Sequence, residues 1–116
     1  MVAAKSIPGK VKREVKEIVE RFNREALGGG KVQYVVRFEG RYLYVNRRDP
    51  PFYESGPICR LEFAGEFANW RFAIYKYSSD QYDPEECWFP GFDKLDGSLE
   101  RALSAGIKAY PPGWAP

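Results

Sequence analysis

Residues 31–48 read KVQYVVRFEGRYLYVNRR, and side chains alternate along them with a period of two. Glu39-Gly40 occupies the position of a tight two-residue hairpin turn. A turn centred there pairs Phe38 with Arg41, Val36 with Leu43 and Tyr34 with Val45. One face then carries Val32, Tyr34, Val36, Phe38, Leu43 and Val45, and the other carries Lys31, Gln33, Val35, Arg37, Tyr42, Tyr44, Asn46 and Arg48. Because a slip of one residue would mix the two sets, we predict a hairpin over 31–48 with one apolar face.

Residues 58–77 follow the same pattern around Gly65-Glu66, after Asp49-Pro50-Pro51 has ended the first hairpin. Pairing Leu61 with Trp70, Cys59 with Phe72 and Phe63 with Ala68 gives an apolar face of Cys59, Leu61, Phe63, Ala68, Trp70, Phe72 and Ile74. The opposite face holds Ile58, Arg60, Glu62, Phe67, Asn69, Arg71, Tyr75 and Tyr77. We expect residues 78–86 to form a polar loop and Cys87-Trp88-Phe89 to be a short edge strand. Both hairpins therefore combine an apolar face with a face of tyrosine and arginine.

Helical patterns flank the predicted strands. An apolar stripe predicts a helix over 8–27 that begins near Ser6 and Pro8 and ends at Gly28-Gly29-Gly30; it consists of Val11, Val15, Ile18, Val19, Phe22 and Ala26. A second helix is predicted over 98–109, capped by Asp96 or Ser98, and followed by an extended tail over 110–116. Gly106 is expected to weaken that helix by about 1 kcal/mol relative to alanine.

These elements predict a single α+β domain over residues 1–116. An antiparallel meander sheet of four to five strands would pack its apolar face against an N-terminal and a C-terminal helix, in the order αββββ(β)α, as a two-layer sandwich. One layer of helices covers only one side of a sheet. We therefore expect the tyrosine–arginine side to face water or a partner, unless the second helix lies on that side instead.

Composition narrows the classes of function. The chain has 116 residues, 44% of them hydrophobic, and a net charge of +2, which argues against disorder. It contains no histidine, which excludes histidine bases and imidazole metal ligands. Cys59 and Cys87 are too few for a disulfide scaffold. Since neither a signal-peptide stretch nor an apolar run of membrane-spanning length appears, we expect a cytoplasmic protein with no membrane association, and we expect no cofactor.

The tyrosine–arginine face supplies the candidate site. It comprises Tyr42, Tyr44, Tyr75, Tyr77, Arg37, Arg60 and Arg71. Aromatic rings on an open sheet can stack on unpaired bases while arginines bind phosphates. The same residues also stabilise a sheet through cross-strand pairs and are favoured at protein interfaces. The sequence therefore favours a non-enzymatic binding module, and it leaves open a protein partner, self-association, single-stranded nucleic acid or mere surface packing.

Charge distribution bears on these alternatives. Residues 1–60 contain 13 basic and 7 acidic side chains, whereas residues 61–116 contain 5 and 9. The basic half can attract a polyanion, although a pI of about 8.5 is low for a dedicated nucleic-acid binder.

Four carboxylates in residues 80–86 support the alternative of an enzyme. Asp80, Asp83, Glu85 and Glu86 could together hold a hard cation in a metal-dependent hydrolase or nuclease. Their spacing fits no calcium-binding loop, and such residues are common at solvated turns. We therefore assign no metal site and no catalytic residue.

The final third of the chain resembles a known kind of protein. Residues 82–91, YDPEECWFPG, and 96–111, DGSLERALSAGIKAYP, are similar to the ends of a family of small uncharacterised prokaryotic single-domain proteins, a domain of unknown function. The resemblance implies a compact cytosolic domain in which a helix precedes an antiparallel sheet and a short helix follows it. It carries no assigned activity, so it implies no functional residues.

Overall fold

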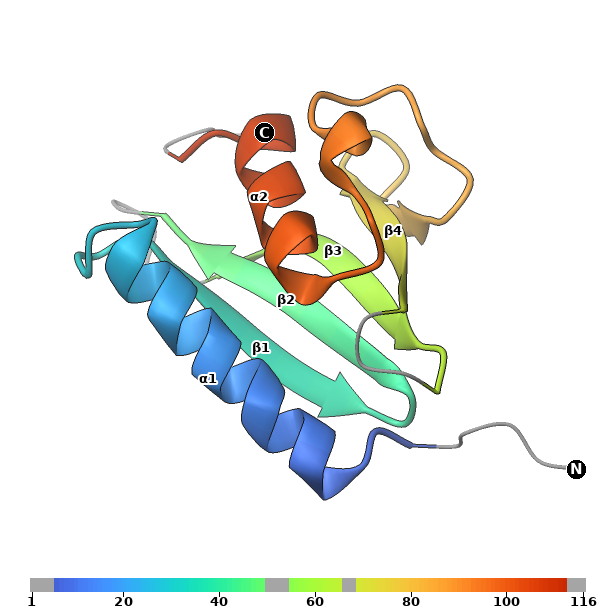
Figure 1. Ribbon diagram of the computed structural model, residues 1–116. Helices are drawn as coiled ribbons and strands as arrows, with labels where there is room; N and C mark the ends of the chain where they lie inside the picture. Colours follow the sequence, from blue (N-terminus) through green and yellow to red (C-terminus); the bar gives the residue numbers. More distant parts are fainter. Residues whose placement is uncertain (1–5, 50–54, 66–68, 113–116) are drawn as a thin grey trace, which may run out of the picture.

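Five antiparallel strands and two α-helices form the described part of the chain, which is residues 6–49, 55–65 and 69–112 of a computed structural model. In chain order the elements are α1 (Gly9–Glu25), β1 (Gln33–Glu39), β2 (Tyr42–Arg48), β3 (Gly56–Phe63), β4 (Trp70–Lys76), β5 (Gln81–Asp83), the 3-10 helix η1 (Phe92–Lys94) and α2 (Leu99–Ala109). The strands form one open sheet in the order β1-β2-β3-β4-β5. Both helices lie on the same side of this sheet (Figure 1), which confirms the α+β meander sandwich and places α2 on the apolar face.

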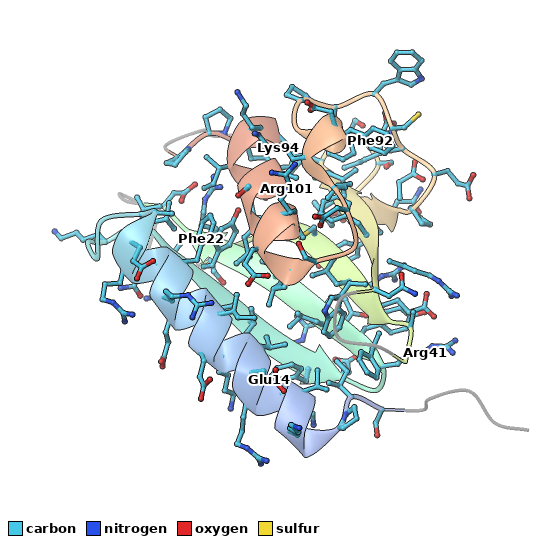
Figure 2. The ribbon with its side chains drawn as sticks, in the orientation of Figure 1. Glu14, Phe22, Arg41, Phe92, Lys94 and Arg101 are labelled. Atoms are coloured by element: carbon cyan, nitrogen blue, oxygen red, sulfur yellow. The ribbon has the colours of Figure 1, made fainter. Side chains whose placement is uncertain are left out.

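Helix α1 packs along β1 through its apolar stripe. Val15, Ile18 and Val19 are buried, and Phe22 reaches over the sheet to the ring of Tyr34, with 5.7 Å between ring centroids (Figure 2). Asn23 binds the edge strand with both ends of its amide, accepting from Tyr34 N at 2.8 Å and donating to Tyr34 O at 3.0 Å. The helix ends at Glu25, two residues before the predicted end, and Gly28 and Gly29 beyond it adopt positive φ angles of 78° and 68°.

Both hairpins differ from the predicted register by two residues. Phe38 pairs with Leu43 and Phe63 with Trp70, not with Arg41 and Ala68. In the first hairpin the two-residue loop is Gly40-Arg41, because the first loop position needs the left-handed conformation that Gly40 supplies with φ 61°. A shift of two residues leaves every side chain on its face, so the predicted division into faces holds for the described residues except Ile58. Phe67 and Ala68, which were also assigned to faces, lie outside the described residues.

A β-bulge in β3 changes the placement of one side chain. Val45 pairs with Cys59 but Asn46 pairs with Pro57, which leaves Ile58 as an extra residue. The sequence placed Ile58 on the polar face. The bulge turns it toward the helices instead, where it is buried beside Gly106.

The core lies between α2, α1 and the apolar side of the sheet. Leu99, Ala102 and Leu103 of α2 pack with Leu43 and Leu61 in one buried cluster. Ser98 is the N-cap, as predicted, and its hydroxyl accepts from Arg101 N at 3.3 Å. Arg101 Nε donates to Lys94 O at 2.7 Å and so joins η1 to α2 (Figure 2). Neither helix is long and apolar enough, over the residues described, to cross a membrane.

A buried ion pair anchors the end of β2 to the end of α2. Arg47 is 2% exposed and donates to the two carboxylate oxygens of Asp49 at 2.8 and 3.0 Å. The same guanidinium donates to Tyr110 O at the C-cap of α2, where a cation also suits the helix dipole. The alternation of β2 puts Arg47 on the apolar face. No role was predicted for Arg47, because the alternating pattern indicates a face that is apolar throughout.

Candidate functional site

The candidate site is the sheet face on which neither of the two described helices lies. Successive side chains of a strand point to opposite faces, so the residues that alternate with the core residues of β1 to β4 share this side. Directly paired positions bring together Arg37 with Tyr44, Tyr44 with Arg60, and Arg60 with Ala73. One row of side chains therefore crosses four strands.

Tyrosine rings form a continuous chain over this face. The ring centroids of Tyr42 and Tyr44 lie 6.2 Å apart, and those of Tyr44 and Tyr82 lie 5.5 Å apart. Tyr82 then contacts Tyr75 at 5.0 Å. Tyr44 and Tyr82 meet although β3 and β4 lie between their strands. Ala73 of β4 is 3% exposed and lies in the same row as Tyr44, and its small side chain leaves room for this contact.

Two guanidinium groups lie over these rings. Arg37 Cζ lies 4.2 Å from the ring centroid of Tyr44, and Arg60 Cζ lies 4.5 Å from that of Tyr42 and 5.4 Å from that of Tyr82. Cation–π contact of this kind holds an otherwise flexible side chain flat against its neighbour. The Arg37 side chain is still 57% exposed, so its outer side is open to a ligand.

The face has an excess of positive charge. Arg37, Arg48, Arg60 and Arg71 oppose Glu39 and Glu62 on the paired strands. Arg37 lies 3.6 Å from Glu39, and Arg71 lies 3.8 Å from Glu62. Within the described ranges, Arg48 and Arg60 have no carboxylate at ion-pair distance. These two cations retain charge for an external partner.

The predicted site residues divide into three groups. Tyr42, Tyr44, Arg37 and Arg60 are brought together as a partly exposed surface, with Arg71 beside them at the strand end. Tyr75 is on the correct face but only 9% exposed, so it supports the other rings and offers little surface. Tyr77 follows β4 at the end of the sheet, where its hydroxyl donates to Pro57 O at 2.9 Å and its ring contacts Tyr110 of the α2 C-cap. It is therefore not part of the open face.

Tyr82 is the member of this surface that the sequence analysis missed. Residues 78–86 were expected to be a loop and residues 87–89 an edge strand, whereas the fifth strand is Gln81–Asp83 and residues 87–89 are not a strand. Asp80 makes the tight return from β4 possible by adopting a φ of 55°, which aspartate tolerates. Burial raises the pKa of Tyr82, so its phenol stays neutral. The signal for β5 was the run of turn-forming residues Ser78-Ser79-Asp80 directly after a strand.

Two of the four carboxylates in residues 80–86, those of Asp83 and Glu86, make contacts within this segment and with Lys76 of β4. Glu86 accepts from Lys76 Nζ at 2.8 Å and from Trp88 N at 2.8 Å. Asp83 accepts from Glu85 N at 2.9 Å and lies 3.7 Å from Lys76 Nζ. Within residues 6–49, 55–65 and 69–112, no three acidic or cysteine side chains are grouped so that they could hold a metal ion. This geometry gives the hydrolase alternative no support.

Searches against protein-family models, curated protein sequences and solved structures find no match. The similarity of the final third to small prokaryotic proteins therefore stays a prediction. Functional inference rests on the geometry described above.

Proposed function

We propose that this protein is a non-enzymatic binding module that holds single-stranded nucleic acid on its open sheet face. The observation that carries the proposal is that the guanidinium groups of Arg37 and Arg60 lie over the rings of Tyr44 and Tyr42, with 4.2 and 4.5 Å from Cζ to ring centroid, on the sheet face that neither described helix covers. A guanidinium plane fixed in this way can stack on an unpaired base with its outer side and donate to phosphate with its edge.

Charge favours a polyanion over a second copy of the chain. A face on which arginines outnumber glutamates repels an identical face, because like charges brought together across an interface cost several kcal/mol. A protein partner with an acidic surface fits the same charges, and tyrosine and arginine are common at protein interfaces. Nucleic acid is the better match because it offers both phosphates and planar bases to the stacked side chains.

Fluorescence anisotropy with labelled single-stranded RNA and DNA tests the proposal. Affinity should fall steeply between about 50 and 200 mM salt, because phosphate contacts release counterions. Arg60→Ala should weaken binding about 5- to 100-fold, since it removes a stacking surface and a phosphate contact together. Arg13→Ala is the matched control, since it removes the same charge from the exposed side of α1.

The proposal fails if no oligonucleotide binds at about 50 mM salt, or if Arg13→Ala and Arg60→Ala weaken binding equally. Light scattering on the free protein adds a separate outcome. A dimer that Arg60→Glu disrupts would show that the face is an interface between copies of this chain and would overturn the proposal.

A further inference from the structure

Acidic side chains interrupt the positive charge of the open sheet face at two positions, Glu39 in β1 and Glu62 in β3. The register places both beside Tyr42, which pairs with Glu39 on one side and with Glu62 on the other. Carboxylates on this face repel the phosphates of a nucleic acid, because like charges brought together cost free energy. The surroundings of each carboxylate therefore decide whether it has a role in binding.

The carboxylate of Glu62 is occupied within the protein. One of its oxygens lies 3.1 Å from Arg41 Nε, and the other lies 3.8 Å from Arg71 Nη1. Each oxygen thus faces a guanidinium group from a neighbouring part of the sheet. Glu62 therefore stabilises the arrangement of arginines on the face and has little capacity left for a ligand.

The carboxylate of Glu39 is open in comparison. Its side chain is 67% exposed, and its Oε2 lies 3.6 Å from Arg37 Nε, which is longer than a hydrogen bond. In the described part of the chain, no other cation lies at ion-pair distance from it. Both oxygens of Glu39 therefore remain available to accept hydrogen bonds from a ligand.

Arg37 places a surface for a base directly beside this carboxylate. Arg37 and Glu39 are two residues apart in β1, so their side chains point to the same face of the sheet. The inner side of the Arg37 guanidinium lies over the ring of Tyr44, and its outer side is open to solvent. A base on that outer side lies within reach of the Glu39 oxygens.

A carboxylate selects among bases by the donors that they offer, because its oxygens only accept hydrogen bonds. The Watson–Crick edge of guanine carries two adjacent donors, N1–H and the N2 amino group, which match the two oxygens of one carboxylate. Adenine, cytosine and uracil each present one donor on this edge, beside an acceptor that a carboxylate repels. Guanine is therefore the base that fits Glu39 best.

We propose that the open sheet face prefers guanine in single-stranded nucleic acid, with the base on the Arg37 guanidinium and its N1–H and N2 amino group donating to the Glu39 carboxylate. The preference rests on the binding of single strands proposed above and adds the identity of one base. Glu39 is then a specificity-determining residue. It weakens the general attraction for phosphate and compensates for that loss only when guanine is bound.

Fluorescence anisotropy with short labelled oligouridines that differ only in the central base tests the preference. The phosphates are the same in every oligonucleotide, so differences in affinity report on the base. Guanosine at the centre should bind about 5- to 150-fold more tightly than uridine, as expected for one bidentate contact to a base. Inosine keeps N1–H but lacks the N2 amino group, so its affinity should lie between those of guanosine and uridine.

Variants assign the preference to Glu39. Glu39→Gln replaces one acceptor oxygen with an amino group, so it should reduce the advantage of guanosine over uridine about 3- to 10-fold. It should not weaken binding of the all-uridine strand, because it removes a negative charge from the face. Glu62→Gln is the matched control, since it removes the same charge from the same face. It should leave the advantage of guanosine unchanged.

The outcomes separate this preference from the proposed function. Equal affinity for guanosine and uridine, inosine binding as tightly as guanosine, or an advantage of guanosine that survives Glu39→Gln would overturn the preference and leave the binding of single strands intact. Absence of binding by every oligonucleotide at about 50 mM salt would overturn both.

Discussion

Replacing Gly106 with alanine tests the packing of α2 because local and tertiary effects oppose each other. In an isolated helix the change stabilises by about 1 kcal/mol. In the folded protein a Cβ at this position would overlap the Tyr34 hydroxyl and lie 2.8 Å from Ile58 Cγ2. The Tyr34 hydroxyl cannot move freely, since it donates to Leu103 O at 2.7 Å in the core.

The magnitude follows from these two contacts. Overpacking a core costs about 1–3 kcal/mol. Losing the buried hydrogen bond of Tyr34 adds about 1–3 kcal/mol if the hydroxyl is pushed away from its acceptor. With the hydrogen bond lost, and after subtraction of about 1 kcal/mol for the gain in helix propensity, we expect Gly106→Ala to lower the free energy of unfolding by about 1–5 kcal/mol.

Urea denaturation monitored by circular dichroism measures this change. The midpoint should fall with an unchanged dependence on denaturant. Tyr34→Phe removes the obstructing hydroxyl, so the double variant should lose less stability than the two single variants together. Gly9→Ala is the control, because a Cβ there meets nothing nearer than Arg13 Nη1 at 3.8 Å. An increase in stability for Gly106→Ala would refute the packing described here.

Three further predictions concern the buried ion pair, the acidic loop and the thiols. Asp49→Ala should destabilise the protein by about 3–5 kcal/mol in thermal or urea unfolding, because it leaves the Arg47 charge buried without its partner. The double variant Arg47→Met with Asp49→Leu should recover most of that loss. Equal instability of the single and the double variant would contradict this account. Hydrogen bonds from Lys76 and from Trp88 N lower the pKa of Glu86, so its contribution to stability is present above the unfolded pKa of about 4.3 and disappears as pH falls through the folded value. Stability measured against pH should therefore decline less in acid for Glu86→Gln than for the unaltered protein, and identical acid limbs would show that this contact contributes nothing. Cys87 is exposed, whereas Cys59 is buried and burial raises the pKa of its thiol. A thiol reagent should therefore modify Cys87 in the folded protein and Cys59 only after unfolding. Rapid modification of Cys59 in the native state would contradict its buried position.

Local patterns predicted the helices and strands because each of these elements depends on residues that are neighbours along the chain. Helical spacing and Gly28-Gly29-Gly30 were sufficient for α1, and alternation was sufficient for the division of both hairpins into faces apart from Ile58, which the bulge turns inward. Alternation repeats every second residue, so it cannot distinguish registers that differ by two. The conformation demanded of Gly40 decided between them.

The candidate surface was predicted in part for the same reason. Tyr42, Tyr44, Arg37 and Arg60 share a face by alternation alone, and the structure confirms that placement. Tyr82 joins them because β5 returns beside β4, and Tyr75 is buried at a place where the rings of Tyr77 and Tyr82 contact it. Contacts of this kind depend on the order of the strands in the sheet, and a short stretch of sequence does not reveal that order.

The sequence by itself determined that this chain builds two amphipathic hairpins and two amphipathic helices, with tyrosine and arginine gathered away from the apolar side. Only the tertiary structure decided that α2 joins α1 on that side, that a bulge turns Ile58 inward, and that Arg47 and Asp49 are buried as a pair. The physical reason is that amphipathic patterns arise from spacing along one element, whereas burial depends on which other element covers it. Which element covers another depends on the packing of many side chains that are distant in sequence. At Gly106, for example, the absence of a side chain makes room for Tyr34 and Ile58.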